Sequence, residues 1–182
     1  MRKILLTGRP RCGKSTLIQT HLADFPLPLG GFAVQRLTWK GETWAFRLLD
    51  LSQEAYISHW ETKREAEDIA IYMASPGKWQ GVARVFDSKG RNALESCWGR
   101  KVLVLMDELG IFERDAAAFQ ASVLATLDRE LPVLGVIKDK AGPFLDRVRR
   151  HPAVTVIRYP ASGVAATVAG FLREVREYAW LD

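Results

Sequence analysis

Residues 8–15 read Gly-Arg-Pro-Arg-Cys-Gly-Lys-Ser and match the pattern G-x-x-x-x-G-K-[ST] of a phosphate-binding loop. The residues just before the match, 3–7, are mostly apolar and predict a buried strand. The residues after it, 15–22, place their apolar side chains on one face of a predicted helix. Because a strand, a glycine-containing loop and a helix in this order are the usual setting of the motif, the stretch predicts a nucleotide-phosphate site in an α/β fold.

Different residues of the loop pattern have different roles in binding phosphate and metal. Glycines let backbone N–H groups turn toward phosphate oxygens, and the N-terminus of the following helix adds the positive end of its dipole. We expect Lys14 to contact the β- and γ-phosphates as part of the catalytic apparatus, and the Ser15 hydroxyl to ligate Mg²⁺. The predicted nucleotide-binding residues are Gly8, Arg9, Pro10, Arg11, Cys12, Gly13, Lys14, Ser15 and Thr16.

Two acidic residues are expected to complete the site. Residues 101–106 are nearly all apolar and predict a central parallel strand that is covered on both faces. Asp107 follows at the carboxyl end of this strand, where ligands of open α/β sheets gather, and we expect it to help hold Mg²⁺. Glu108 comes next and is expected to orient the attacking water or to accept its proton.

Residues 107–110, Asp-Glu-Leu-Gly, also fit the D-x-x-G pattern of small GTPases. Two observations count against that interpretation: no N-K-x-D or T-K-x-D follows a later strand, and a glutamate directly after the aspartate is typical of an ATPase that carries its own base. The two interpretations differ in topology. The ATPase type places a strand between the strands 3–7 and 101–106, whereas the GTPase type makes them neighbours.

The remaining apolar segments alternate with helical patterns, which predicts a mainly parallel sheet with helices on both faces. This is a three-layer α/β/α sandwich of RecA-like or nucleotide-kinase-like type, in one domain over residues 1–182. Residues 32–37 and 44–49 predict an antiparallel hairpin that we expect at the edge of the sheet. The other predicted elements are strands at 132–137 and 154–158, a helix capped by Asp115, and helices at 143–150 and 163–178.

The segment between the hairpin and the central strand is the least informative. Residues 64–74 fit a helix, and residues 81–86 resemble a short strand. Asp87 or Ser88 is expected to cap a helix that runs to about Trp98.

The amino-acid composition limits the classes of protein to which the chain can belong. Of the 182 residues 48% are hydrophobic and 26% are charged, and no apolar run approaches the ~20 residues of a membrane span. The chain enters a predicted strand almost at once, so we expect no signal peptide. Cys12 and Cys97 are too few for a disulfide framework, which predicts free thiols in a reducing cytoplasm.

The net charge of +5 reflects basic residues that are concentrated in the second half of the chain. Such a bias fits a nucleic-acid surface or a pocket that neutralises a triphosphate. A solvated helix face is the plainer interpretation of Arg147, Arg149 and Arg150. No zinc-ligand spacing or RNA-recognition signature is present, so nucleic acid is an open partner that no motif indicates, and the oligomeric state is left undetermined.

These residues carry a resemblance to the cancer-related nucleoside-triphosphatase family of small P-loop NTPases. The loop with Pro10 at its third position resembles that family's G-x-P-G-x-G-K-[ST], and residues 107–113 resemble its D-E-[IL]-G-x-[ML]-E. Gly31 with Phe32 and the hairpin that follows resemble a glycine-aromatic segment, and residues 133–136 fall where the family has a further core strand. The resemblance implies slow Mg²⁺-dependent hydrolysis of ATP and other nucleoside triphosphates.

The resemblance also implies that Glu113 is a site residue, against the plainer interpretation of an exposed loop acid. The chain departs from the family pattern at Arg11, which replaces a loop glycine, and at residues 79–82 and 158–160. These departures concern base recognition and catalytic rate more than phosphate binding.

Three further basic residues are candidates for contact with the γ-phosphate. Arg9 and Arg11 lie in the loop, where either could fold over the phosphate, although such residues more often face solvent. Lys138 follows a predicted core strand and is a candidate γ-phosphate sensor.

Three functions are compatible with these motifs. The leading one is hydrolysis of a triphosphate to the diphosphate and phosphate. A nucleotide or small-molecule kinase on the same fold would pass the γ-phosphate to an acceptor instead of water. A non-catalytic, nucleotide-gated binding module is the third.

Overall fold

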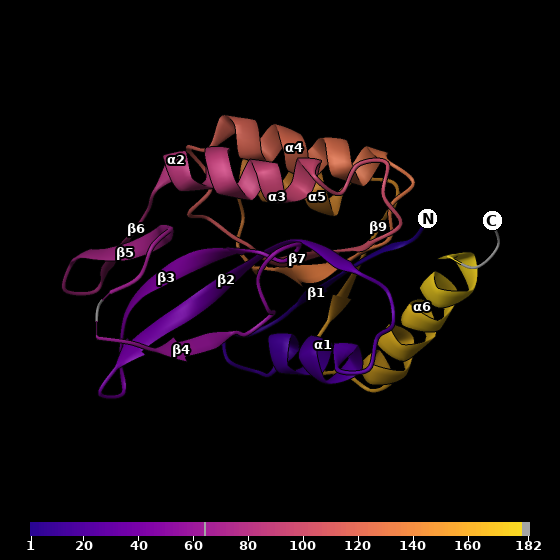
Figure 1. Ribbon diagram of the computed structural model, residues 1–182, viewed down its shortest axis with the longest axis horizontal. Coiled ribbons are helices and arrows are strands. Elements are labelled where there is room, and N and C mark those ends of the chain that lie inside the picture. Colours follow the sequence, from indigo (N-terminus) through magenta and orange to yellow (C-terminus); the bar gives the residue numbers. More distant parts are fainter. Residues whose placement is uncertain (64, 180–182) are drawn as a thin grey trace.

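The computed structural model describes residues 1–63 and 65–179, whose strands join in one nine-stranded sheet (Figure 1). The strands are β1 (Lys3–Thr7), β2 (Leu29–Trp39), β3 (Glu42–Asp50), β4 (His59–Glu61), β5 (Ile69–Ser75), β6 (Lys78–Gly81), β7 (Leu103–Leu109), β8 (Val133–Ile137) and β9 (Val154–Arg158). The helices are α1 (Lys14–Leu22), α2 (Ala83–Val85), the π-helical turn η1 (Phe86–Gly90), α3 (Arg91–Glu95), α4 (Ala117–Asp128), α5 (Pro143–Arg149) and α6 (Val164–Ala179).

Helices cover both faces of the sheet and produce the three layers that the sequence predicts. Figure 1 shows α2, α3, α4 and α5 on one face, and α1 and α6 on the other. Phe32 of β2 meets Phe119 of α4 edge-on in the core of the first face, with ring centroids 5.0 Å apart. Ile18 of α1 and Phe171 of α6 are buried on the opposite face. No helix in the described part of the chain is long and apolar enough to cross a membrane.

The strand order decides between the two interpretations of the acidic motif. The order is β6-β5-β3-β2-β7-β8-β1-β9, and β4 pairs with β2 off this path. The strands from β2 to β9 in this order pair in parallel. β8 lies between β1 and β7, as the ATPase interpretation predicts, so the GTPase-like arrangement is wrong. The carboxyl ends of β1, β7 and β8 therefore share one edge of the sheet.

The predicted hairpin forms from β2 and β3, but its expected place at the sheet edge is wrong. β2 begins at Leu29, three residues before the predicted start at residue 32, and it pairs with β7 on its other side. A Cβ at Gly31 would lie 2.1 Å from the carbonyl oxygen of Leu105, so a glycine permits this close pairing. The sheet then continues beyond β3 through β5 and β6.

Four further predictions, for the middle of the chain, are also corrected. Residues 64–74 form no helix in their described part, because β5 occupies Ile69–Ser75 and pairs with β3. Residues 81–86 do not form a strand, since β6 ends at Gly81 and α2 follows. The helix expected to start at Asp87 begins earlier, with α2. Asp87 instead accepts a hydrogen bond of 2.8 Å from the backbone N–H of Phe119, so it satisfies the first turn of α4 in place of Asp115.

Candidate active site

The phosphate-loop residues leave β1 at Gly8 and enter α1 at Lys14. Gly8 and Gly13 have φ angles of 143° and 96°, a conformation that favours glycine. A Cβ at Gly8 would lie 2.0 Å from the carbonyl oxygen of Tyr159, so this glycine lets the loop pack against the end of β9. The buried Lys14 donates from Nζ to the carbonyl oxygens of Gly8 at 3.2 Å and Arg9 at 2.8 Å. The loop therefore curls around the Lys14 ammonium group.

The other predicted loop residues lie around this centre. Arg9, Pro10, Arg11 and Thr16 are exposed. Cys12 is partly buried, and its Sγ lies 3.6 Å from Nζ of Lys14. The structure thus separates the single buried cation of the loop from two arginines at its surface.

Asp107 lies near the end of β7, on the same side of the sheet as α1. Its carboxylate is buried and is within hydrogen-bonding reach of the Ser15 hydroxyl. The Tyr56 hydroxyl donates a short hydrogen bond to Oδ2 of Asp107. Burial raises the pKa of Asp107 to about 6, and the hydrogen bonds from Tyr56 and Ser15 oppose that rise. The two predicted metal ligands are therefore neighbours, and Tyr56 joins them.

Tyr56 is the site residue that sequence reasoning missed. It belongs to the segment between β3 and β4, which carries no recognisable motif. Nothing in the local sequence distinguishes this tyrosine from a surface aromatic residue, because its contact with Asp107 arises only when the strands pair.

Glu108 and Glu113 both interact with the charge of one lysine, Lys138. Oε1 of Glu108 is 3.0 Å from Nζ of Lys138, which directly follows β8. Glu113 is buried, and its Oε2 accepts a hydrogen bond of 3.0 Å from the backbone N–H of Gly110. Burial raises the pKa of Glu113 to about 7, against the lowering effects of backbone hydrogen bonds and of the Lys138 charge. Glu113 is therefore not an exposed loop acid, and the Lys138 charge acts on it while Lys138 pairs with Glu108.

Ser15 and Asp107 have the chemistry of a Mg²⁺ site, since this cation prefers hydroxyl, carboxylate and water oxygens. Within the described residues, no group of three or more His, Cys, Asp or Glu side chains could hold a metal ion. A divalent cation at Asp107 would therefore take further ligands from phosphate and water, which is the common way in which proteins bind Mg²⁺.

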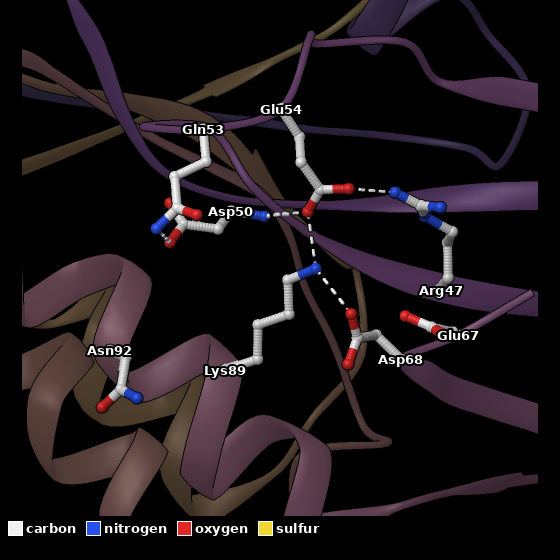
Figure 2. A pocket seen from close by; sticks show the side chains of 8 residues that line it. All are labelled: Arg47, Asp50, Gln53, Glu54, Glu67, Asp68, Lys89 and Asn92. Atoms are coloured by element: carbon white, nitrogen blue, oxygen red, sulfur yellow. Dashed lines mark hydrogen bonds and ion pairs between the residues drawn. The ribbon is translucent and has the colours of Figure 1, made fainter.

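A cavity of about 500 Å³ lies outside this site, between the end of β3 and the η1–α3 helical segment (Figure 2). Glu54 accepts hydrogen bonds there from the side chains of Arg47 and Lys89 and from the backbone N–H of Asp50. Lys89 also pairs with Asp68 at 2.7 Å. The central charges of this cavity neutralise one another, and its lining contains none of the predicted site residues.

Comparisons with known proteins agree on one class. The profile of a family described as NTPase matches residues 3–160. The chain is 29% identical over 154 residues to the nucleoside-triphosphatase THEP1 of Thermotoga petrophila, and the match covers 85% of this chain and 82% of that protein. It is 28% identical to the nucleoside-triphosphatase THEP1 of Methanosarcina barkeri, with 97% of this chain and 100% of that protein covered.

Two solved structures share the fold. The crystal structure of THEP1 from Aquifex aeolicus superposes with a TM-score of 0.70 at 18% identity, and it covers 96% of this chain and 99% of its own. The solution structure of a human cancer-related nucleoside triphosphatase superposes with a TM-score of 0.69 at 20% identity, with 97% and 98% covered.

Proposed function

The chain belongs to the NTPase family and is a nucleoside triphosphatase, and from this premise we propose that it hydrolyses ATP and other nucleoside triphosphates in a Mg²⁺-dependent reaction. One observation carries the proposal. Lys14, the Ser15–Asp107 pair and Glu108 lie along one edge of the sheet, at the carboxyl ends of β1 and β7. A phosphate cradle, a metal-binding pair and a proton acceptor are thereby brought to one place.

Triphosphate binding is assigned to the loop. The backbone N–H groups at the start of α1 face the phosphates, and the α1 dipole favours their negative charge. Lys14 exchanges its two carbonyl acceptors in the loop for phosphate oxygens. Ser15 and Asp107 would hold the Mg²⁺, which when bound would neutralise charge on the β- and γ-phosphates.

The hydrolytic step is assigned to Glu108. A water oxygen attacks the γ-phosphorus, the bond to the oxygen that bridges the β- and γ-phosphorus atoms breaks, and Glu108 takes up the proton of the water. The ion pair with Lys138 orients the carboxylate of Glu108 at the end of β7. Products are the nucleoside diphosphate and inorganic phosphate.

Phosphate release without any acceptor tests the proposal. ATP, GTP, CTP and UTP are each incubated with the protein, with Mg²⁺ or with excess EDTA. We expect phosphate from ATP and from at least one other nucleotide with Mg²⁺, and none above background with EDTA. Formation of the nucleoside diphosphate without free phosphate, seen only when an acceptor is added, would instead identify a kinase.

We also propose that the protein works in the cytoplasm. Cys12 and Cys97 are both free thiols, and Cys12 lies in the phosphate loop beside Lys14. A reducing compartment keeps such a thiol from oxidation.

A further inference from the structure

The segment between β3 and β4 reaches across the metal-binding pair. Its Tyr56 is partly buried, donates a hydrogen bond to Oδ2 of Asp107 and is within hydrogen-bonding reach of Ser15. Asp107 and Ser15 come from β7 and α1, so Tyr56 adds a third element to the same point. The proposed function does not use this hydroxyl group.

The backbone around Tyr56 is fastened in place from two sides. Nε2 of Gln19, on α1, donates to the carbonyl oxygen of Tyr56 at 3.1 Å. Nε2 of Gln35, on β2, donates to the carbonyl oxygen of Ile57 at 2.8 Å, and the backbone N–H of Arg36 donates to the carbonyl oxygen of Ser58 at 2.9 Å. Because two elements hold three successive carbonyl groups, the position of the Tyr56 backbone relative to α1 is fixed by the fold.

The direction of the hydrogen bond matters for a metal ligand. A carboxylate has two oxygens with about four lone-pair sites, so one bond to Oδ2 leaves capacity for a metal ion or its bound water. A carboxylate that is already oriented loses less freedom when the metal binds. Groups that hydrogen-bond to ligating carboxylates typically account for about 10- to 100-fold in metal affinity.

We propose that Tyr56 is a positioning residue of the divalent-metal site: its hydroxyl holds the Asp107 carboxylate beside Ser15 in the arrangement that receives the metal ion. The proposal rests on the Mg²⁺ dependence of the proposed function. Tyr56 acts through Asp107 and takes no part in the chemical step.

The test measures metal binding rather than turnover. Mn²⁺ is titrated into the full-length protein with a β,γ-imido analogue of ATP, and free Mn²⁺ is read by its electron paramagnetic resonance signal. For Tyr56→Phe we expect the Mn²⁺ dissociation constant to rise about tenfold. Affinity for the analogue in EDTA should stay within about twofold of the wild type, since the phosphate loop is unchanged.

Two further variants serve as controls for this interpretation. Tyr72→Phe removes a hydroxyl from a tyrosine on β5 that is 38% exposed, and it should leave both affinities unchanged. Gln19→Ala removes one bond to the loop backbone and should weaken Mn²⁺ binding in the same direction, but less. Thermal unfolding of each variant establishes that the fold is retained.

The outcomes separate this proposal from the one on which it rests. An unchanged or tighter Mn²⁺ dissociation constant in folded Tyr56→Phe would overturn the positioning role and leave the metal dependence of the wild type intact. A wild-type protein whose nucleotide affinity does not respond to Mn²⁺ or Mg²⁺ would overturn the metal dependence, and this proposal with it.

Discussion

Lys14 is the buried cation at the centre of the phosphate loop, and its removal should weaken nucleotide binding directly. Lys14→Ala deletes a charge that lies among backbone carbonyl groups and is assigned to the phosphates. We expect affinity for the ATP analogue to fall by about 10- to 100-fold or more, the range of charged hydrogen bonds. Isothermal titration calorimetry measures this change, and Lys140→Ala, at an exposed lysine, serves as the control. Equal affinity in Lys14→Ala and the wild type would contradict the loop assignment.

Substitution of Glu108 should lower turnover without weakening ATP binding. Glu108→Gln keeps the shape of the side chain but removes its capacity to accept a proton, so turnover should fall by ~10²-fold or more while ATP affinity stays within about a few-fold. Asp107→Asn should also weaken the metal-dependent part of binding. Phosphate release and calorimetry on both variants distinguish the two roles. Wild-type turnover in Glu108→Gln would shift the role of base to Glu113 or to another group.

Glu113 makes folding stability depend on pH. Its pKa is about 7 in the folded protein against an ordinary value of 4.5, so the folded state holds the proton more tightly. The free energy of unfolding should therefore fall as the pH rises from about 4.5 to about 7. Glu113→Gln keeps an acceptor for the Gly110 N–H and should flatten this fall. Asp107 contributes a similar decline between 3.8 and about 6, which the variant retains.

Urea unfolding at pH 5 and pH 7.5 measures the effect. The wild type should lose more stability between the two values than Glu113→Gln does. An equal loss in both proteins would show that Glu113 does not carry the proton.

At the scale of the elements, the segment between β3 and β4 joins two places. Glu54 anchors its start among the charged groups of the cavity in Figure 2, and Tyr56 contacts Asp107 of the proposed metal site two residues later. Glu54→Gln leaves Arg47 and Lys89 with like charges and no shared carboxylate. We expect a loss of about 1–3 kcal/mol in the free energy of unfolding, because the half-buried Arg47 loses its carboxylate partner while Lys89 keeps its pair with Asp68. Chemical denaturation provides the measurement.

A second acid that lines the same cavity provides the control for Glu54→Gln. Glu67 is exposed, and Glu67→Gln should change stability by less than about 0.5 kcal/mol. Equal effects of the two substitutions would mean that the ion pairs of Glu54 contribute nothing specific to the fold.

At the scale of the whole molecule, the features that depend on a short stretch of sequence were predicted, and those that depend on pairing between distant segments were not. The loop at residues 8–15, the apolar strand that leads to Asp107 and the helix at 163–178 each follow from a short stretch, and the structure confirms them. The helix expected at 64–74 was wrong because its apolar spacing also suits the strand β5, and pairing with β3 decides between them. The position of the hairpin depends likewise on the contact of Gly31 with β7.

The residues of the candidate site likewise divide into those that a motif predicts and those that only the packing of the chain brings together. Lys14, Ser15, Asp107 and Glu108 belong to motifs whose spacing reveals them. Burial of Glu113 and its proximity to Lys138 follow from the packing of two chain segments, so the sequence alone left it between a site residue and a loop acid. Tyr56 has no motif at all, since its role depends on a contact across 51 positions of sequence.

The position of β1 in the sheet has a consequence for how the protein is made on the ribosome. β1 carries the phosphate loop, yet both of its neighbours, β8 and β9, come from the last third of the chain. Gly8 also packs on the carbonyl group of Tyr159. The loop therefore lacks one of its two supporting strands until the strand at Val154–Arg158 has left the exit tunnel. Nascent chains that stop before this strand should fail to retain nucleotide, and chains that extend past it should retain nucleotide.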